Sequence, residues 1–195
     1  PDVFLIDVFD GMRSVLEQLS KKTYQSSSLD AKAFRVLMDH LRAATFLIAD
    51  GVTPSNKDQG YFVRRLLRRA VRYGRQLGIH EIFCSRIAAE VIRTYQASYS
   101  RLQSVSEKIL QEIQTEEEKF LKTLVNGEKE VDKLFVQKEN ISGQDAFVLY
   151  STYGFPLELT EEMAVEKGQQ VDRAVFKEEF KKHQAKSREG SVKKF

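Results

Sequence analysis

Apolar residues recur at helical spacing along nearly the whole chain, and no segment shows the alternation of period two that a half-buried strand needs. Only 3 prolines and 10 glycines interrupt the 195 residues. The pattern therefore predicts an all-α, multi-helix fold with about eight helices. Their expected ranges are 2–22, 30–49, 61–77, 80–97, 100–138, 143–150, 160–167 and 172–188.

Glycines and small polar residues mark the expected helix ends. Asp50-Gly51 closes the second range and Gly78 the third, since glycine suits the left-handed residue that follows a helix. Side chains that accept a hydrogen bond from a free backbone N–H begin several others. The expected N-caps are Ser55 or Asn56, Ser142 with Asp145 as its reciprocal partner, Thr160 and Asp172. The tail from Gly190 to Phe195 is expected to fray.

Residues 100–138 form a long, strongly charged stretch with only a thin apolar stripe. We expect a long helix or hairpin that protrudes from the body, with a break near Asn126-Gly127 and with Glu116 to Glu118 on a solvated face. The composition changes near residue 100, from a basic half to an acidic one. This change predicts two subdomains, 1–100 and 101–195.

The range 61–77 separates into two faces when its residues are placed on a helix. At about 100° per residue, its arginines fall within an arc of roughly 140° and its apolar residues fill the rest. The arginines form a strip about 16 Å long. We call this strip the arginine face, and its members are Arg64, Arg65, Arg68, Arg69, Arg72 and Arg75.

The positive charge is local to this helix. The whole chain has a formal net charge of only +3, with 31 Lys and Arg against 28 Asp and Glu. Between Lys57 and Arg75 there are seven basic residues and one acid, Asp58. Because arginine offers a planar fork that grips phosphate in two places, this concentration favours binding to a nucleic-acid backbone.

Two other interpretations of the arginine face stay open. Its guanidinium groups can pair with the acidic residues of 107–139, or dock on an acidic protein patch, including a patch on a domain of the same chain. A DNA-binding helix-turn-helix is less favoured, because the turn that precedes the arginine helix is longer than the usual three or four residues.

No catalytic signature or metal-ligand spacing appears in the sequence. Cys84 is the only cysteine, which fits a reducing compartment, and His40, His80 and His183 lie far apart. No apolar run approaches the roughly 20 residues needed to cross a bilayer, and no signal peptide pattern is present. Two polar segments, Pro54-Ser55-Asn56 and Ser151 to Gly154, offer donors and acceptors that base edges can use.

Several long strings of residues are distinctive. They are HLRAATFLIADGVTPSN over 40–56, GYFVRRLLRRAVR over 60–72, Ala146-Phe147, and TYGFPLELT over 152–160. Together these strings closely resemble the alanyl-tRNA synthetases, in their bacterial form. The resemblance covers essentially the whole chain and is weaker across 80–140.

The resemblance implies a class II aminoacyl-tRNA synthetase that activates alanine with ATP and Mg and transfers it to its tRNA in the cytoplasm. This chain would be the helical tRNA-recognition region that follows the catalytic domain. The chain starts without Met in the middle of an element, so we expect a piece of a larger protein. Its expected partners are the alanine tRNA acceptor stem, the upstream catalytic domain and a downstream editing domain with a zinc site. Neither ATP nor zinc is expected to bind here, and neither DNA nor a membrane is an expected partner.

The family recognises a G·U wobble pair in the acceptor stem, and the resemblance carries this role to particular residues. Asn56 is one implied reader of the pair. The second reader in the family is an Asp directly before the Thr-Tyr-Gly-Phe-Pro string, and here that position is Ser151, which can accept a hydrogen bond but carries no charge. The expected backbone contacts are Arg64, Arg65, Arg68, Arg69 and Arg72, and no catalytic or metal-binding residue is expected.

Overall fold

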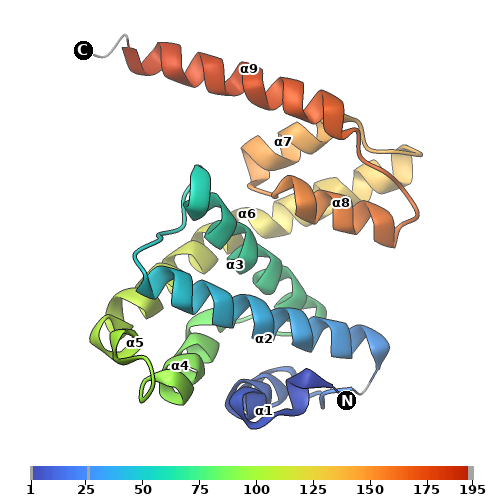
Figure 1. Ribbon diagram of the computed structural model, residues 1–195. Helices are drawn as coiled ribbons and strands as arrows, with labels where there is room; N and C mark the ends of the chain where they lie inside the picture. Colours follow the sequence, from blue (N-terminus) through green and yellow to red (C-terminus); the bar gives the residue numbers. More distant parts are fainter. Residues whose placement is uncertain (1, 26, 193–195) are drawn as a thin grey trace. The chain divides into compact units, whose positions relative to one another are not determined.

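A computed structural model describes residues 2–25 and 27–192, with side chains to residue 185, and these residues form helices almost throughout (Figure 1). The described residues contain two short 3₁₀ helices, η1 (Val3–Leu5) and η2 (Asp7–Phe9), and nine α-helices. The α-helices are α1 (Asp10–Ser20), α2 (Ser28–Ala49), α3 (Asp58–Gln76), α4 (Cys84–Tyr95), α5 (Ser100–Ser104), α6 (Ser106–Gln137), α7 (Gly143–Tyr153), α8 (Leu157–Glu166) and α9 (Arg173–Val192). The predicted all-α class is confirmed.

The chain divides into two compact units between Lys119 and Phe120, within α6. The first unit contains α1 to α5 and the N-terminal part of α6, and the second contains the rest of α6 with α7, α8 and α9. Among the described helices, none combines the length and the apolar character that a bilayer crossing requires.

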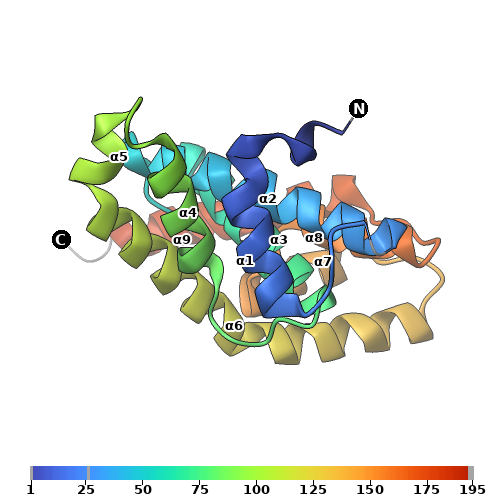
Figure 2. The same ribbon diagram turned by 90° about the horizontal axis from the view of Figure 1, so that it is seen from below.

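The core of the first unit lies between α2 and its neighbours. Helix α3 packs along α2, and α4 lies beside α1 and against α2 (Figure 1 and Figure 2). The apolar sides of these helices are mostly buried, and for α3 this follows the two faces that the sequence predicted, with Phe62 as an exposed exception. Core residues include Phe34, Leu37, Leu41, Val63, Leu67, Val71, Tyr73, Ile87 and Val91.

The predicted helix over 2–22 is wrong at its start, where two 3₁₀ turns precede α1. The Asp2 carboxylate accepts a hydrogen bond from the Phe4 N–H, and the Asp7 carboxylate accepts one from the Val8 N–H. Ile6 has an extended backbone between the two turns. Short aspartate side chains that bond the nearby backbone compete with a continuous helix, and here they divide the segment.

The start of α3 also differs from the prediction. Lys57 is its N-cap and makes no capping hydrogen bond with its side chain, so neither Ser55 nor Asn56 caps this helix. Ser55 instead holds the turn, because its N–H donates to the Gly60 carbonyl at 3.0 Å. A Cβ on Gly60 would lie 2.2 Å from Ser55 Oγ, so the glycine allows this close approach. The predicted ends at Gly51 and Gly78 are confirmed, with φ of +96° and +92°.

The long helix predicted over 100–138 exists as α6, with α5 as a short separate helix before it. The predicted break near Asn126-Gly127 is wrong, since α6 runs through both residues. The prediction that this helix protrudes is also wrong, because its apolar stripe is buried along the parts of α6 that belong to each unit. Ile109, Ile113, Phe120, Leu124 and Val131 are fully buried.

The second unit is organised around α7, which packs against α9 and α8 (Figure 1). Rings of Phe147 and Tyr150 on α7 meet rings of Phe176 and Phe180 on α9, with centroids 5.4 to 6.1 Å apart. The reciprocal cap between Ser142 and Asp145 at the start of α7 is confirmed.

Two predicted boundaries in the second unit are wrong and one is right. Helix α7 continues to Tyr153, because Gly154 at φ +71° supplies the left-handed cap only there. Helix α8 begins at Leu157 after Pro156, so Thr160 is a buried residue inside the helix and not its cap. The Asp172 carboxylate does cap α9, accepting from the Val175 N–H at 3.0 Å. Residues 193–195 of the expected frayed tail lie outside the described residues.

Candidate nucleic-acid interface

The arginine face of α3 is only partly open to solvent. The apolar side of α3 is buried through residues such as Val63, Leu67 and Val71. On the opposite side five of the six arginines are half-buried, and the Arg68 residue is only 8% exposed. Other side chains therefore cover part of each arginine, and the arginine face is not fully exposed to solvent.

Glu116 on α6 pairs with two of these arginines. Its Oε1 accepts a hydrogen bond from Arg68 Nε at 2.8 Å and forms an ion pair with Arg68 Nη2 at 2.6 Å. Arg64 Nε lies 3.2 Å from the same oxygen as an ion pair, without the alignment of a hydrogen bond. The interpretation that arginines pair with acids of 107–139 therefore holds for Arg64 and Arg68. The guanidinium of Arg68 is thus buried against Glu116.

Glu117 is buried beside Glu116, so the predicted solvated face of Glu116 to Glu118 is wrong for both residues. Its carboxylate accepts from the N–H groups of Phe83 and Cys84, at 3.1 and 2.9 Å, where α4 begins. Burial raises the pKa of Glu117, against the lowering effect of these two hydrogen bonds. Burial also raises the pKa of the Cys84 thiol, which is part of the core.

Three of the other arginines lie against aromatic or histidine side chains. Arg65 lies over the Phe62 ring at 5.0 Å, and Arg72 over the Tyr73 ring at 5.6 Å. Arg69 lies over the same Tyr73 ring at 5.3 Å, and its Nη1 donates to His40 Nε2 at 2.7 Å. Rings and the imidazole thus hold these guanidinium groups in place.

Asn56 is exposed in the loop that leads into α3, as a reader of bases needs to be. Its Oδ1 accepts a hydrogen bond from Arg64 Nη1. Because a carbonyl oxygen has two lone pairs, Oδ1 keeps capacity for a second donor. The amide is thus exposed and also oriented by the first arginine of the arginine face.

Ser151 is exposed in the last turn of α7, in the second unit. The residues after it are fixed against α6. Thr123 Oγ1 donates to the Tyr153 carbonyl at 2.8 Å, and the Phe155 ring packs on the Phe120 ring at 5.7 Å. The Thr-Tyr-Gly-Phe-Pro string therefore has an internal packing role, and Ser151 and Thr152 are the residues that it leaves exposed.

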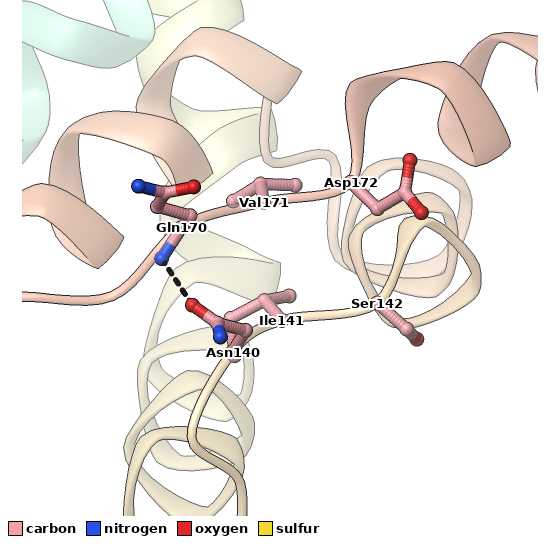
Figure 3. Close-up of a pocket in the computed structure, with 6 residues that line it drawn as sticks. All are labelled: Asn140, Ile141, Ser142, Gln170, Val171 and Asp172. Atoms are coloured by element: carbon pink, nitrogen blue, oxygen red, sulfur yellow. Dashed lines mark hydrogen bonds between the residues drawn. The ribbon is translucent and has the colours of Figure 1, made fainter.

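A shallow hollow lies where the segments before α7 and α9 run side by side (Figure 3). Ile141 and Val171 form an isolated parallel bridge there, and Asn140 Oδ1 accepts from the Gln170 N–H at 2.9 Å. The nearby Ser142 and Asp172 side chains cap the two helices. The polar groups of this hollow thus serve the fold and do not form a candidate site.

Clusters of ligating side chains that could hold a metal ion do not occur in the described part of the chain. The candidate residues are therefore the arginines and the exposed Asn56 amide in the first unit and the exposed Ser151 hydroxyl in the second, and each is a donor or an acceptor suited to phosphates or base edges.

Comparison with known proteins shows the family to which the chain belongs. The sequence profile of the family described as "tRNA synthetases class II (A)" matches residues 1–195. Curated relatives that cover 99% of the chain are alanine–tRNA ligases. The chain belongs to the alanyl-tRNA synthetase family. The resemblance inferred from the sequence strings is thus confirmed.

Alanine–tRNA ligases of several bacteria are similar to this chain. The alanine–tRNA ligase of Borreliella afzelii (strain PKo) is 43% identical over 197 residues, and that of Treponema pallidum (strain Nichols) is 44% identical over 200 residues. Each match covers 99% of this chain and 33% of the relative. The Synechococcus elongatus enzyme is 45% identical over 178 residues, which are 90% of this chain and 20% of the enzyme. The chain thus spans a third or less of the alanyl-tRNA synthetases that it matches.

Proposed function

We propose that this chain is the acceptor-stem recognition region of an alanine–tRNA ligase. The observation that carries the proposal is the exposed Asn56 amide beside the arginine face of α3, in a chain of this family. The whole enzyme would ligate alanine to its tRNA with ATP and Mg, in the cytoplasm where its tRNA is used. We assign alanine, ATP and a zinc-dependent editing site to other parts of that enzyme.

Arg65, Arg69 and Arg72 are the proposed contacts to the acceptor-stem backbone. All three are half-buried and are held by rings or by His40, so their guanidinium groups bind phosphate at a low entropic cost. Arg64 and Arg68 are bound by Glu116 and support this face from within. Backbone contacts of this kind fix the register of the RNA but do not read its sequence.

Asn56 is the proposed reader of the G·U pair. An A-form helix presents a wide, shallow minor groove, where the amino group of guanine is a hydrogen-bond donor. A wobble pair leaves this amino group less occupied than a Watson–Crick pair does. The Asn56 Oδ1 has a lone pair left to accept from it. Ser151 is the second proposed reader, through its exposed hydroxyl.

A second function is favoured by one observation, the pairing of Glu116 with Arg64 and Arg68. It shows that carboxylates can occupy this face, so the remaining arginines could dock an acidic protein surface, such as one on the catalytic domain of the same enzyme.

Salt dependence separates the two functions. We expect an alanine acceptor-stem hairpin to bind this chain with an affinity that falls by a log–log slope of about −0.7 to −0.9 per neutralised phosphate. Arg72→Gln should make the slope shallower by about 1, while Arg86→Gln, an exposed arginine of α4 paired with Glu81, should leave the slope unchanged. The same slope in Arg72→Gln and wild type, or no binding at low salt, would instead support a protein-docking face.

A further inference from the structure

We propose that Glu116 is a positioning residue for base recognition, which acts on Asn56 through Arg64. This inference rests on the proposed role of Asn56 and extends that role to a buried carboxylate 60 residues away in the sequence. The structure joins the three residues in one line: Glu116 on α6, Arg64 on α3 and Asn56 in the loop before α3.

Glu116 is a fixed point in this line. Its side chain is 3% exposed, and Arg68 binds it with both Nε and Nη2. The Arg68 side chain is itself only 10% exposed, so the pair forms a charged contact that water barely reaches. Buried ion pairs with good geometry resist rearrangement, because each charge would be left uncompensated without the other.

Arg64 extends from this fixed point to the loop. Its Nε lies 3.2 Å from Glu116 Oε1, while Nη1 at the other end of the guanidinium donates to Asn56 Oδ1. The guanidinium is planar and rigid, so one end held by Glu116 sets the direction of the other. Only a forked, planar group makes both contacts at once.

Asn56 needs this support because its own loop offers little. It is exposed, it does not cap α3, and an unheld amide would rotate between several rotamers. A donor with full positive charge fixes Oδ1 as the atom that faces Arg64, and the second lone pair of Oδ1 then points in a defined direction. Glu116 thus raises the specificity of recognition by orienting the acceptor, with no contact to the RNA.

Two variants of the chain break the line at different points. Arg64→Lys keeps the positive charge beside Glu116 but removes the fork that reaches Asn56. Glu116→Gln keeps the shape of the side chain but leaves Arg64 and Arg68 without their counter-charge. The matched controls are Glu118→Gln, two residues further along α6, and Arg86→Lys on α4.

The first readout is the ratio of affinities for hairpins with G·U and with G–C, measured for every variant after circular dichroism has shown that it folds. Wild type and both controls should prefer G·U by about 10-fold, the usual scale of one base contact. Arg64→Lys and Glu116→Gln should bind both hairpins alike, with the G–C affinity within about threefold of wild type. Unchanged discrimination in a folded Arg64→Lys variant would overturn the proposal. If Glu116→Gln does not fold, the Arg64→Lys result decides alone.

The second readout does not use RNA. In wild type, the two side-chain amide protons of Asn56 should have NMR chemical shifts that differ from those of an asparagine in an unfolded peptide. In both variants, these chemical shifts should move toward the unfolded-peptide values, because the side chain then samples several rotamers. Identical Asn56 signals in wild type and variants would overturn the positioning role even if the hairpins are discriminated. If wild type does not discriminate the hairpins, the proposed function fails instead, while the Asn56 signals still test whether Glu116 holds the amide.

Discussion

At the scale of single residues, three neighbouring glutamates of α6 have three different environments. Glu116 is buried against Arg64 and Arg68, Glu117 is buried at the start of α4, and Glu118 is half-buried with a hydrogen bond from Gln114. A carboxylate without a partner would not remain in such places, because burying a charge is costly. The partners of Glu116 and Glu117 therefore explain why these two charged side chains are buried.

Glu117 should contribute strongly to stability. Glu117→Ala removes the acceptor for two buried N–H groups at the start of α4, so we expect a loss of about 2 kcal/mol, in line with lost helix caps and unsatisfied buried donors. Chemical denaturation monitored by circular dichroism measures this loss. Glu118→Ala is the matched control and should change stability by less than about 0.5 kcal/mol. Equal effects of the two substitutions would contradict the capping role.

Asp2 should make stability depend on pH in the acid range. Hydrogen bonds from the Tyr24 hydroxyl at 2.5 Å and from Arg35 Nη2 at 2.7 Å outweigh desolvation and hold the pKa of Asp2 far below its ordinary value of 3.8. Because the pKa is lowered on folding, the stabilisation is fully present above the unfolded value and is lost as the pH falls through the folded one.

The test compares wild type with Asp2→Asn in urea unfolding across the acid range. The stability difference between the two proteins should be constant from neutral pH down to about pH 5 and should shrink below about pH 4. A difference that stays constant down to the lowest pH at which both proteins fold would show that the Asp2 charge does not contribute.

At the scale of helices, the sequence pattern predicted the interiors well and the ends less well. The interiors of α2, α3 and α4 follow the apolar period, which packing enforces. The helix ends depend on local side-chain hydrogen bonds and on glycines, and the spacing of apolar residues gives no information about either. The Asp2 and Asp7 side chains divided the first helix, and Gly154 extended α7 through Ser151 to Tyr153.

The candidate site was predictable in part for the same reason. The arginine face followed from the period of α3, and Asn56 and Ser151 followed from family resemblance. Glu116 was missed, although Ile113 and Phe120 place it about 60° from the buried stripe of α6. The negative charge of Glu116 suggested a side chain exposed to solvent. Its burial is explained only by its ion pair with Arg68, which lies on another helix.

Substitution of Gly127 tests how closely α6 packs on the loop after α7, because the glycine permits α6 to pass this loop without a break. A Cβ on Gly127 would lie 2.2 Å from Phe155 Cε2 and 3.0 Å from Tyr153 Cβ. Although alanine favours a helix by about 1 kcal/mol, Gly127→Ala should be destabilising by about 1–3 kcal/mol through overpacking. Thermal unfolding measures this change. The control is Asn126→Ala at the neighbouring exposed residue, which should be neutral or stabilising in the same measurement. A stabilised Gly127→Ala variant would contradict the close packing of Phe155.

At the scale of the whole molecule, the chain belongs to the alanyl-tRNA synthetase family, and six of its arginines lie on the single helix α3. The net charge is only +3, so the positive charge of the arginine face is local and does not make the chain a general polycation. The central claim is that this surface presents Asn56 to one particular base pair.

The most direct test is the binding of this chain to an alanine acceptor-stem hairpin with its G·U pair and with G–C in its place, for wild type and Asn56→Ala. The account predicts that wild type binds the G·U hairpin more tightly and that Asn56→Ala removes this preference while the chain still binds both hairpins. Equal binding of the two hairpins by wild type, or a preference that survives Asn56→Ala, would contradict it.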